Sequence, residues 1–324
     1  MGAVTIDPDR CVGALAGTCV GDALGMPVEG WTWRRIRQHY GEVRDMLPAR
    51  LGAGTFTDDT LLTMALAESL LAQEGRVVPE DLVRRFRAVY DPRRGFGAGM
   101  HRLIRLWDEG VPWEEAARRV FDGGSYGNGA AMRVAPVGVL FPGDLHAAYK
   151  AAVAQAQVTH AHPLAQQAAG LQAMAVSLAM VTSAASFDPE DFVAELEASL
   201  PASAETLRRS LMLLLDVKDR WQDRDLIVHK LGNGAAAHRS VPTAIFAFVT
   251  FWRSFEEALV YAVSLGGDTD TIAAMTGAIA GAFHGLRAVP PRWWQALESG
   301  PQGKEKIVKL AEQLCALAQK LQAR

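Results

Sequence analysis

The apolar positions of the chain repeat mainly with the spacing of an α-helix. The segment from Thr60 to Gly75 is rich in helix formers and is predicted to end at Gly75. Segments 199–217 and 254–265 each begin with a serine that is followed by a glutamate, a pattern typical of helix starts. An amphipathic C-terminal helix is predicted from the i, i+3, i+4 and i+7 spacing of Ile307, Leu310, Ala311, Leu314, Leu317, Ala318 and Leu321.

Evidence for strands is scarce by comparison. Alternating β-branched stretches bounded by turns are few, and no strand, glycine-rich turn and helix unit of the dinucleotide-binding kind is found. Short Gly/Pro loops separate the helical segments, and no linker or shift in composition marks a domain boundary. The sequence therefore predicts an all-α fold, with residues 1–324 forming one domain.

Composition narrows the possible classes of protein. A chain of 324 residues that is 49% hydrophobic can bury a substantial core, and its formal net charge is only -3. Because no strongly basic block occurs, we expect no direct reading of nucleic acid. The N-terminus lacks the features of a signal peptide, and polar residues interrupt the most apolar stretch, Ala168 to Ala185. We therefore expect no membrane span.

The three cysteines favour a reducing compartment. Cys11 and Cys19 would lie roughly 12 Å apart along one helix, which is too far for a disulfide. We expect buried free thiols and a cytoplasmic protein.

Two acidic clusters stand directly before apolar runs. The first is Thr57, Asp58, Asp59 and Thr60, and the second is Asp268, Thr269, Asp270 and Thr271. Helix capping explains one such cluster, but one cap residue suffices and each cluster has two acids and two threonines. If the clusters meet in space, four carboxylates converge, and they require protonation or a cation. Oxygen ligands suit Mg²⁺, Mn²⁺ or Ca²⁺.

Two further acids, Asp22 and Glu29, occur in "GDALGMPVEG". We place both on a turn punctuated by glycine and proline. There they would add carboxylates to the same site.

Three glycine-rich segments, 91–103, 122–138 and 230–245, share a common pattern of glycines followed by a resumed helix. Glycine lets the backbone approach a ligand closely, and N–H groups at a helix start bind phosphate. Ser125 adds a hydroxyl and Tyr126 an aromatic face. A simple turn explains any one of these loops. Three loops together with two acidic clusters favour a nucleotide site.

The ordered motifs resemble the ADP-ribosylglycohydrolase family from about Arg10 to about Trp294. They are "GDALGMPVEG", "TDDT", "GFGAG", "GSYGNGAAMRVAP", "VTHAHPL", "LGNGAAAHRSVPTAI" and "GGDTDTIAAMTGAIAGAFHG". The GSYGNG and LGNG…SVPTAI segments are most similar to the branch that releases ADP-ribose from serine and cleaves poly(ADP-ribose) and O-acetyl-ADP-ribose.

This resemblance implies a compact orthogonal helical bundle with two Mg²⁺ ions, replaced by Mn²⁺ in some members. The implied metal ligands are Thr57, Asp58, Asp59, Asp268, Asp270 and Thr271. Glu29 matches a carboxylate near the metals and the scissile ribose. Proton transfer falls to Glu29 or Asp268, and both remain candidates.

The resemblance also implies the ligand-binding residues. We expect Gly124, Ser125, Gly127 and Asn128 to hold the diphosphate, with Tyr126 against the adenosine. Gly97 and Gly99 would admit the ligand, His160 would contact it, and Asn233 would touch the adenosine or shape its pocket. His162 is interpreted as structural. The segment before GSYGNG is one residue shorter than in the serine branch, so Phe121 is not expected to reach the adenine.

The predicted function is a Mg²⁺-dependent hydrolase that removes ADP-ribose from O-linked serine acceptors. Two alternatives stay open: cleavage of the N-glycosidic bond to arginine, and a catalytically inactive relative that binds ADP-ribose or is structural. The expected partner is an ADP-ribosylated protein or another ADP-ribose conjugate. We expect a monomer.

Overall fold

The computed structural model describes residues 6–49 and 51–323, and their secondary structure is helical apart from two isolated bridges. The first α-helices are α1 (Pro8–Gly25), α2 (Trp33–Tyr40), α3 (Asp58–Ala72), α4 (Pro79–Val89), α5 (Ala98–Asp108), α6 (Trp113–Arg119), α7 (Ala135–Leu140), α8 (Leu145–Gln157) and α9 (Pro163–Val181). The others are α10 (Pro189–Ser199), α11 (Glu205–Val217), α12 (Arg224–Lys230), α13 (Ala237–Thr250), α14 (Phe255–Ser264), α15 (Thr269–His284), α16 (Pro291–Ala296) and α17 (Lys304–Gln322). Short 3₁₀ turns are η1 (Met26–Val28), η2 (Asn128–Ala130), η3 (Ala184–Ser186), η4 (Lys218–Arg220) and η5 (Leu286–Ala288). The all-α prediction is confirmed.

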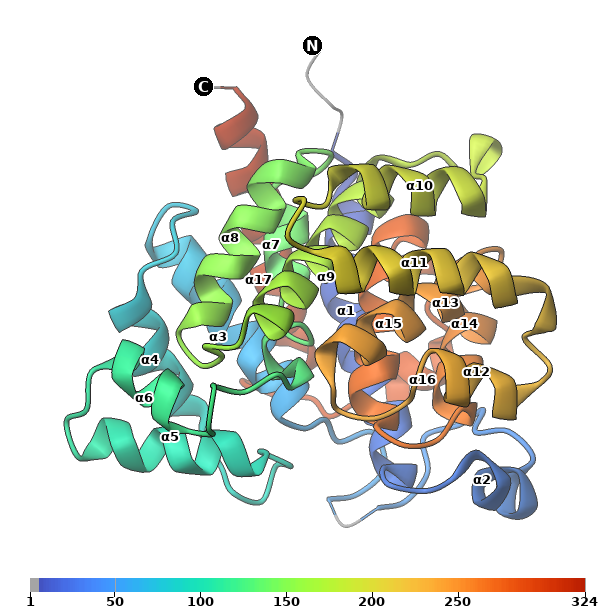
Figure 1. The fold of residues 1–324 in the computed structure, drawn as a ribbon, viewed down its shortest axis with the longest axis horizontal. Helices are drawn as coiled ribbons and strands as arrows, with labels where there is room; N and C mark the ends of the chain where they lie inside the picture. Colours follow the sequence, from blue (N-terminus) through green and yellow to red (C-terminus); the bar gives the residue numbers. More distant parts are fainter. Residues whose placement is uncertain (1–5, 50, 324) are drawn as a thin grey trace.

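Helices α1 and α15 form the centre of the molecule, with α4, α5 and α6 to one side and α2 and α12 to the other (Figure 1). Both central helices are buried almost along their whole length. They lie so close that a Cβ atom on Gly17 would be 1.9 Å from the carbonyl oxygen of Gly277. At Gly25 the same atom would be 2.4 Å from the Thr269 carbonyl oxygen. Only glycine permits this backbone contact, which brings the end of α1 against the start of α15.

The predicted helix boundaries agree in part with those of the structure. The C-terminal amphipathic helix is confirmed as α17, and Ser254 caps α14 by accepting a hydrogen bond from the Glu257 N–H at 3.2 Å. The predicted serine start of segment 199–217 is wrong, because Ser199 ends α10 and α11 begins after Ala204. Helix α3 ends at Ala72, three residues before Gly75.

Burial in the structure bears on two expectations, the absence of a membrane span and the presence of buried free cysteines. Two segments, Pro8–Val28 and Pro163–Val181, are long and apolar enough to cross a membrane, but 94% and 72% of their apolar windows are buried in the protein. The core helix of a soluble protein passes the same test of length and hydropathy. The test therefore does not decide the question, and the absence of a membrane span stays a prediction. All three cysteines are free and buried, as expected.

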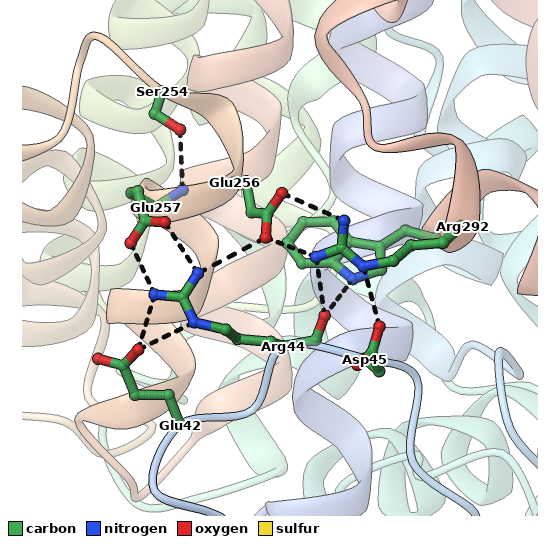
Figure 2. Close-up of polar contacts among 8 residues, drawn as sticks. Glu42, Arg44, Asp45, Ser254, Glu256, Glu257 and Arg292 are labelled. Carbon is green, nitrogen blue, oxygen red and sulfur yellow. Dashed lines mark hydrogen bonds and ion pairs between the residues drawn. The ribbon is translucent and has the colours of Figure 1, made fainter.

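A surface network of charges joins the loop after α2 to α14 and α16 (Figure 2). Arg44 donates to Glu257 at 2.8 Å and to Glu42 at 2.7 Å. Arg292 donates to Asp45 at 2.9 Å and also pairs with Glu256. Each carboxylate of the network therefore has an arginine partner.

Candidate active site

The two acidic clusters, far apart in the sequence, meet in the structure. Asp58 and Asp59 form the first turn of α3, while Asp268 precedes α15 and Asp270 lies in its first turn. Carboxylate oxygens of Asp22, Asp59 and Asp270 lie within 4.8 Å of one another. A second group with the same spacing consists of Glu29, Asp268 and Asp270. The close contact of α1 with α15 and the start of α3 therefore create one acidic centre.

Asp22 is not on a turn with Glu29, so that expectation is wrong. It lies inside α1 and is fully buried. Its carboxylate accepts hydrogen bonds from the Thr57 N–H at 2.9 Å and from the Thr60 hydroxyl at 2.6 Å. The Thr60 N–H and the Thr57 hydroxyl add bonds of 3.1 and 2.9 Å. Asp22 thus holds the start of α3 in place beneath the acidic centre.

Asp59 has an unsatisfied oxygen at the middle of this centre. Its Oδ2 lies 3.2 Å from the Thr57 hydroxyl and 3.4 Å from the Thr271 hydroxyl. Its Oδ1 is buried and has no hydrogen-bond partner among the described residues. A buried carboxylate oxygen without a partner is costly. Together with the surrounding carboxylates and hydroxyls, it fits a divalent cation that prefers oxygen ligands.

The pKa values of the centre reflect the same crowding. Burial, followed by the charge of Asp22, raises the pKa of Asp58 to about 8. Burial raises the pKa values of Asp59 and Asp270 well above their usual range, and neighbouring carboxylates add to the effect. Burial also raises the pKa of Asp268. Without a cation, burial and the neighbouring carboxylates therefore shift these acids toward their protonated forms.

Carboxylates of the acidic centre line a cavity of about 780 Å³. Of the residues predicted to form the site, those lining the cavity are Glu29, Asp58, Asp59, Gly97, Gly99, Gly124, Ser125, Tyr126, Gly127, Asn128, His160, Asn233, Asp268, Asp270 and Thr271. Thr57 is fully buried and does not line it. The size is that of a pocket for a nucleotide-sized ligand.

The glycine-rich loops form the other walls. Backbone bonds tie segment 126–128 to segment 235–237: Asn128 N–H donates to the Ala235 carbonyl at 2.9 Å, and Ala237 N–H to the Tyr126 carbonyl at 3.0 Å. Tyr126 lines the cavity and is 55% exposed, and its ring lies edge-on to the His162 ring with the centroids 5.9 Å apart. A Cβ atom on Gly97 would meet nothing within 4 Å, which leaves open space at the start of α5.

Two asparagines couple these loops to the acidic centre. The Asn128 amide donates to Asp268 at 2.6 Å, so this residue lies closer to the carboxylates than its expected diphosphate role suggests. The Asn233 side-chain amide donates to the Leu265 carbonyl at 2.9 Å, and the Asn233 backbone carbonyl accepts from the Asp268 N–H at 2.7 Å. Asn233 therefore shapes the loop that carries Asp268.

Other predicted positions can be placed as well. Phe121 lines the cavity and is 36% exposed, so the shorter segment does not withdraw its ring from the site. His162 accepts a hydrogen bond from the Leu164 N–H at 3.2 Å and caps α9, which agrees with its structural interpretation.

Sequence reasoning missed two residues beside the site. Arg133 is fully buried and lines the cavity, as does the neighbouring Thr159. The signal for Arg133 was available, since a lone arginine stands in the apolar run of "AAMRVAPVG". A buried cation of this kind requires specific partners.

Comparison with known proteins identifies the class. The family model for ADP-ribosylglycohydrolase matches residues 4–324. The chain is 36% identical to ADP-ribosylhydrolase ARH3 of Bos taurus over 96% of this chain and 93% of that protein. It is 35% identical to ADP-ribosylhydrolase ARH3 of Homo sapiens, with coverage of 96% and 94%.

A solved structure gives the same result. The chain matches an ADP-ribosylglycohydrolase-related protein complex with a TM-score of 0.74 and 33% identity, covering 96% of this chain and 98% of that one. The fold and the acidic cavity thus define a helical glycosyl hydrolase that acts on ADP-ribosylated substrates. The chain belongs to the ADP-ribosylglycohydrolase family, and the predicted resemblance is confirmed.

Proposed function

We propose that this enzyme removes ADP-ribose from O-linked serine acceptors, with poly(ADP-ribose) and O-acetyl-ADP-ribose as further O-linked substrates. The observation that carries the proposal is that clustered carboxylates line the same cavity as the glycine-rich loops and the aromatic side chains of Phe121 and Tyr126. The preference for serine rests on the GSYGNG and LGNG…SVPTAI segments. We further propose that the enzyme acts as a cytoplasmic monomer.

The acidic centre would hold two Mg²⁺ ions, or Mn²⁺ in their place. The ligands would be Thr57, Asp58, Asp59, Asp268, Asp270 and Thr271. Such ions act as Lewis acids that orient sugar hydroxyls and lower the pKa of water. The unpartnered Asp59 Oδ1 supports this assignment, since cation binding would satisfy it.

The nucleotide would lie along the glycine-rich loops. Gly124, Ser125 and Gly127 would contact the diphosphate, and the exposed Tyr126 ring would cover the adenosine. Because a side chain at Gly97 would enter open space, the backbone there can approach the ligand. The distal ribose would then lie beside the carboxylates of the acidic centre.

Proton transfer at the scissile bond falls to Glu29 and Asp268. Both carboxylates lie within 4.8 Å of Asp270. A serine alkoxide is a poor leaving group, so a carboxyl group that retains its proton near neutral pH is valuable as a general acid. Asn128 fixes the orientation of Asp268 by donating a hydrogen bond to its carboxylate at 2.6 Å, and both Glu29 and Asp268 remain candidates for the proton transfer.

The test is hydrolysis of matched peptides that carry serine-linked or arginine-linked ADP-ribose, with Mg²⁺ present. We expect ADP-ribose release from the serine peptide. Release from arginine alone would establish the N-glycosidic alternative. Binding of ADP-ribose without turnover of either peptide would indicate an inactive relative.

A further inference from the structure

A chain of hydrogen bonds leads from the buried guanidinium of Arg133 to the cavity. Arg133 Nη2 donates to the Thr159 hydroxyl at 2.8 Å. The same hydroxyl lies 2.7 Å from His160 Nδ1. His160 lines the cavity, so the chain ends at the ligand site.

The chemistry of these groups fixes the hydrogen positions. A guanidinium has donors and no acceptor, so the Thr159 oxygen must accept the bond from Arg133. The hydroxyl has one hydrogen, and His160 Nδ1 is the acceptor that the structure offers it. A neutral imidazole that accepts at Nδ1 carries its hydrogen on Nε2.

Arg133 itself is held firmly. Its Nε donates to the Gln155 side-chain oxygen at 2.7 Å, and its guanidinium lies 4.4 Å from the centre of the Phe86 ring. The Gln155 side-chain NH₂ group donates in turn to the Ala130 carbonyl at 2.9 Å. This bond orients the amide so that its oxygen faces Arg133. The donor to Thr159 therefore has a defined position.

The His160 ring stays neutral in this setting. Burial, followed by the charge of Arg133, lowers the pKa of His160 to about 3. Burial also lowers the pKa of Arg133 to about 9, which leaves that group charged at neutral pH. The remaining ring nitrogen of His160 is therefore an uncharged N–H donor.

This donor faces the GSYGNG loop. A Cβ atom on Gly129 would lie 3.5 Å from His160 Nε2, and one on Gly127 would lie 3.9 Å away. No described residue accepts a hydrogen bond from Nε2. The space beside it is the cavity in which the nucleotide is proposed to bind.

We propose that Arg133 and Thr159 are positioning residues that orient His160 as an Nε2–H donor to an acceptor oxygen of the nucleotide held along Gly127–Gly129. This inference rests on the proposed function. It adds the tautomer of His160 and the residues that impose it. The cavity would thereby favour an oxygen acceptor at this point and disfavour a cationic group.

The first experiment measures the tautomer in the free protein. Proton–nitrogen correlation spectra of protein with ¹⁵N-labelled histidine should show His160 with Nε2 protonated and Nδ1 unprotonated, unchanged from pH 5 to pH 8. His160 is assigned by the signal lost in H160N. A hydrogen on Nδ1, or titration of the ring in this range, would overturn the proposal without bearing on the hydrolase activity.

The second experiment removes the relay hydroxyl. In the presence of Mg²⁺, Thr159→Val should raise the dissociation constant of ADP-ribose about tenfold and raise KM with kcat nearly unchanged. Thr159→Ser should restore both values to within about twofold. The matched control is Thr276→Val, which removes another buried hydroxyl, one that bonds only to carbonyls of its surroundings.

The outcomes separate the two hypotheses. Unchanged ADP-ribose affinity in Thr159→Val overturns the positioning role, and so does an equal loss in Thr159→Ser. If Thr159→Val does not fold, the wild-type spectrum and Thr159→Ser still decide. If wild-type protein with Mg²⁺ does not bind ADP-ribose, the proposed function fails. The spectrum of the free protein is independent of that result, because it would still show whether His160 carries its hydrogen on Nε2.

Discussion

Carboxylates are concentrated in two regions of this molecule, and the regions differ in whether basic side chains pair with those carboxylates. At the surface, Glu42, Glu256 and Glu257 each pair with Arg44 or Arg292 (Figure 2). In the acidic centre, none of Asp22, Asp58, Asp59, Asp268 and Asp270 forms an ion pair with a described lysine or arginine. Every carboxylate of the surface network therefore has an arginine partner, whereas these five carboxylates of the centre have none among the described residues.

The difference separates a structural network from a functional site. Exposed ion pairs change the stability of a protein little, because solvent screens them. Buried acids without a partner cation reduce stability unless a proton or metal neutralises them. The raised pKa of Asp58, about 8, shows this cost, whereas Arg44 lowers the pKa of Glu257.

The largest expected effect is loss of activity in Asp270→Asn. Because an outer-shell partner of a metal already accounts for roughly 10–100-fold in activity, we expect this change of a proposed ligand to lower kcat/KM at least ~100-fold. Far-UV circular dichroism should stay helical. Asp45→Asn is the matched control, since Asp45 belongs to the surface network and is 72% exposed. Full activity of Asp270→Asn would contradict the ligand assignment.

A smaller effect is expected on stability when divalent cations are removed. With Mg²⁺ at about 100 times its dissociation constant, the bound form gains about 2.7 kcal/mol per site. A raised carboxyl pKa favours the folded state at low pH, and this contribution is lost as pH rises through the folded value. The metal-free protein should therefore lose stability from about pH 4 to about pH 8.

Thermal melts with Mg²⁺ and with a chelator test this dependence. The difference in melting temperature should grow as pH rises toward the pKa of Asp58, about 8. A difference that is absent, or is the same at pH 5 and pH 8, would mean that the centre does not bind cations in place of protons.

The smallest effect is expected from the surface network. Arg44→Ala removes the partner of Glu42 and Glu257, and should lower the free energy of unfolding by about 1 kcal/mol. Salt should reduce the difference between variant and wild type, because it screens these pairs. The kcat/KM value should not change. A large loss of activity in Arg44→Ala would remove the functional distinction between the two regions.

Local patterns in the sequence predicted much of the fold and the candidate site. Helical periodicity identified α17, and the cap at Ser254 was readable because it depends on neighbouring residues. The acidic clusters were recognisable because each holds more oxygen ligands than a helix start needs. Motif resemblance, rather than spacing, indicated that the clusters act together.

Long-range packing could not be predicted in the same way. Gly13, Gly17, Gly21 and Gly25 recur every fourth residue, but only the structure shows that they let α15 lie against α1. That contact places Asp22 in the core, within α1, where its carboxylate accepts from the Thr57 N–H. Interpretation of the local sequence alone predicts a turn at this position. The partners of Arg133 were equally hidden, since Gln155 and Thr159 lie 22 and 26 residues away.

The most direct test is a crystal structure of the protein with Mn²⁺ and ADP-ribose, using anomalous scattering to locate the ions. We predict two anomalous peaks among Asp58, Asp59, Asp268 and Asp270, with the distal ribose beside them. ADP-ribose bound in the cavity with no anomalous peak at these carboxylates would contradict the account.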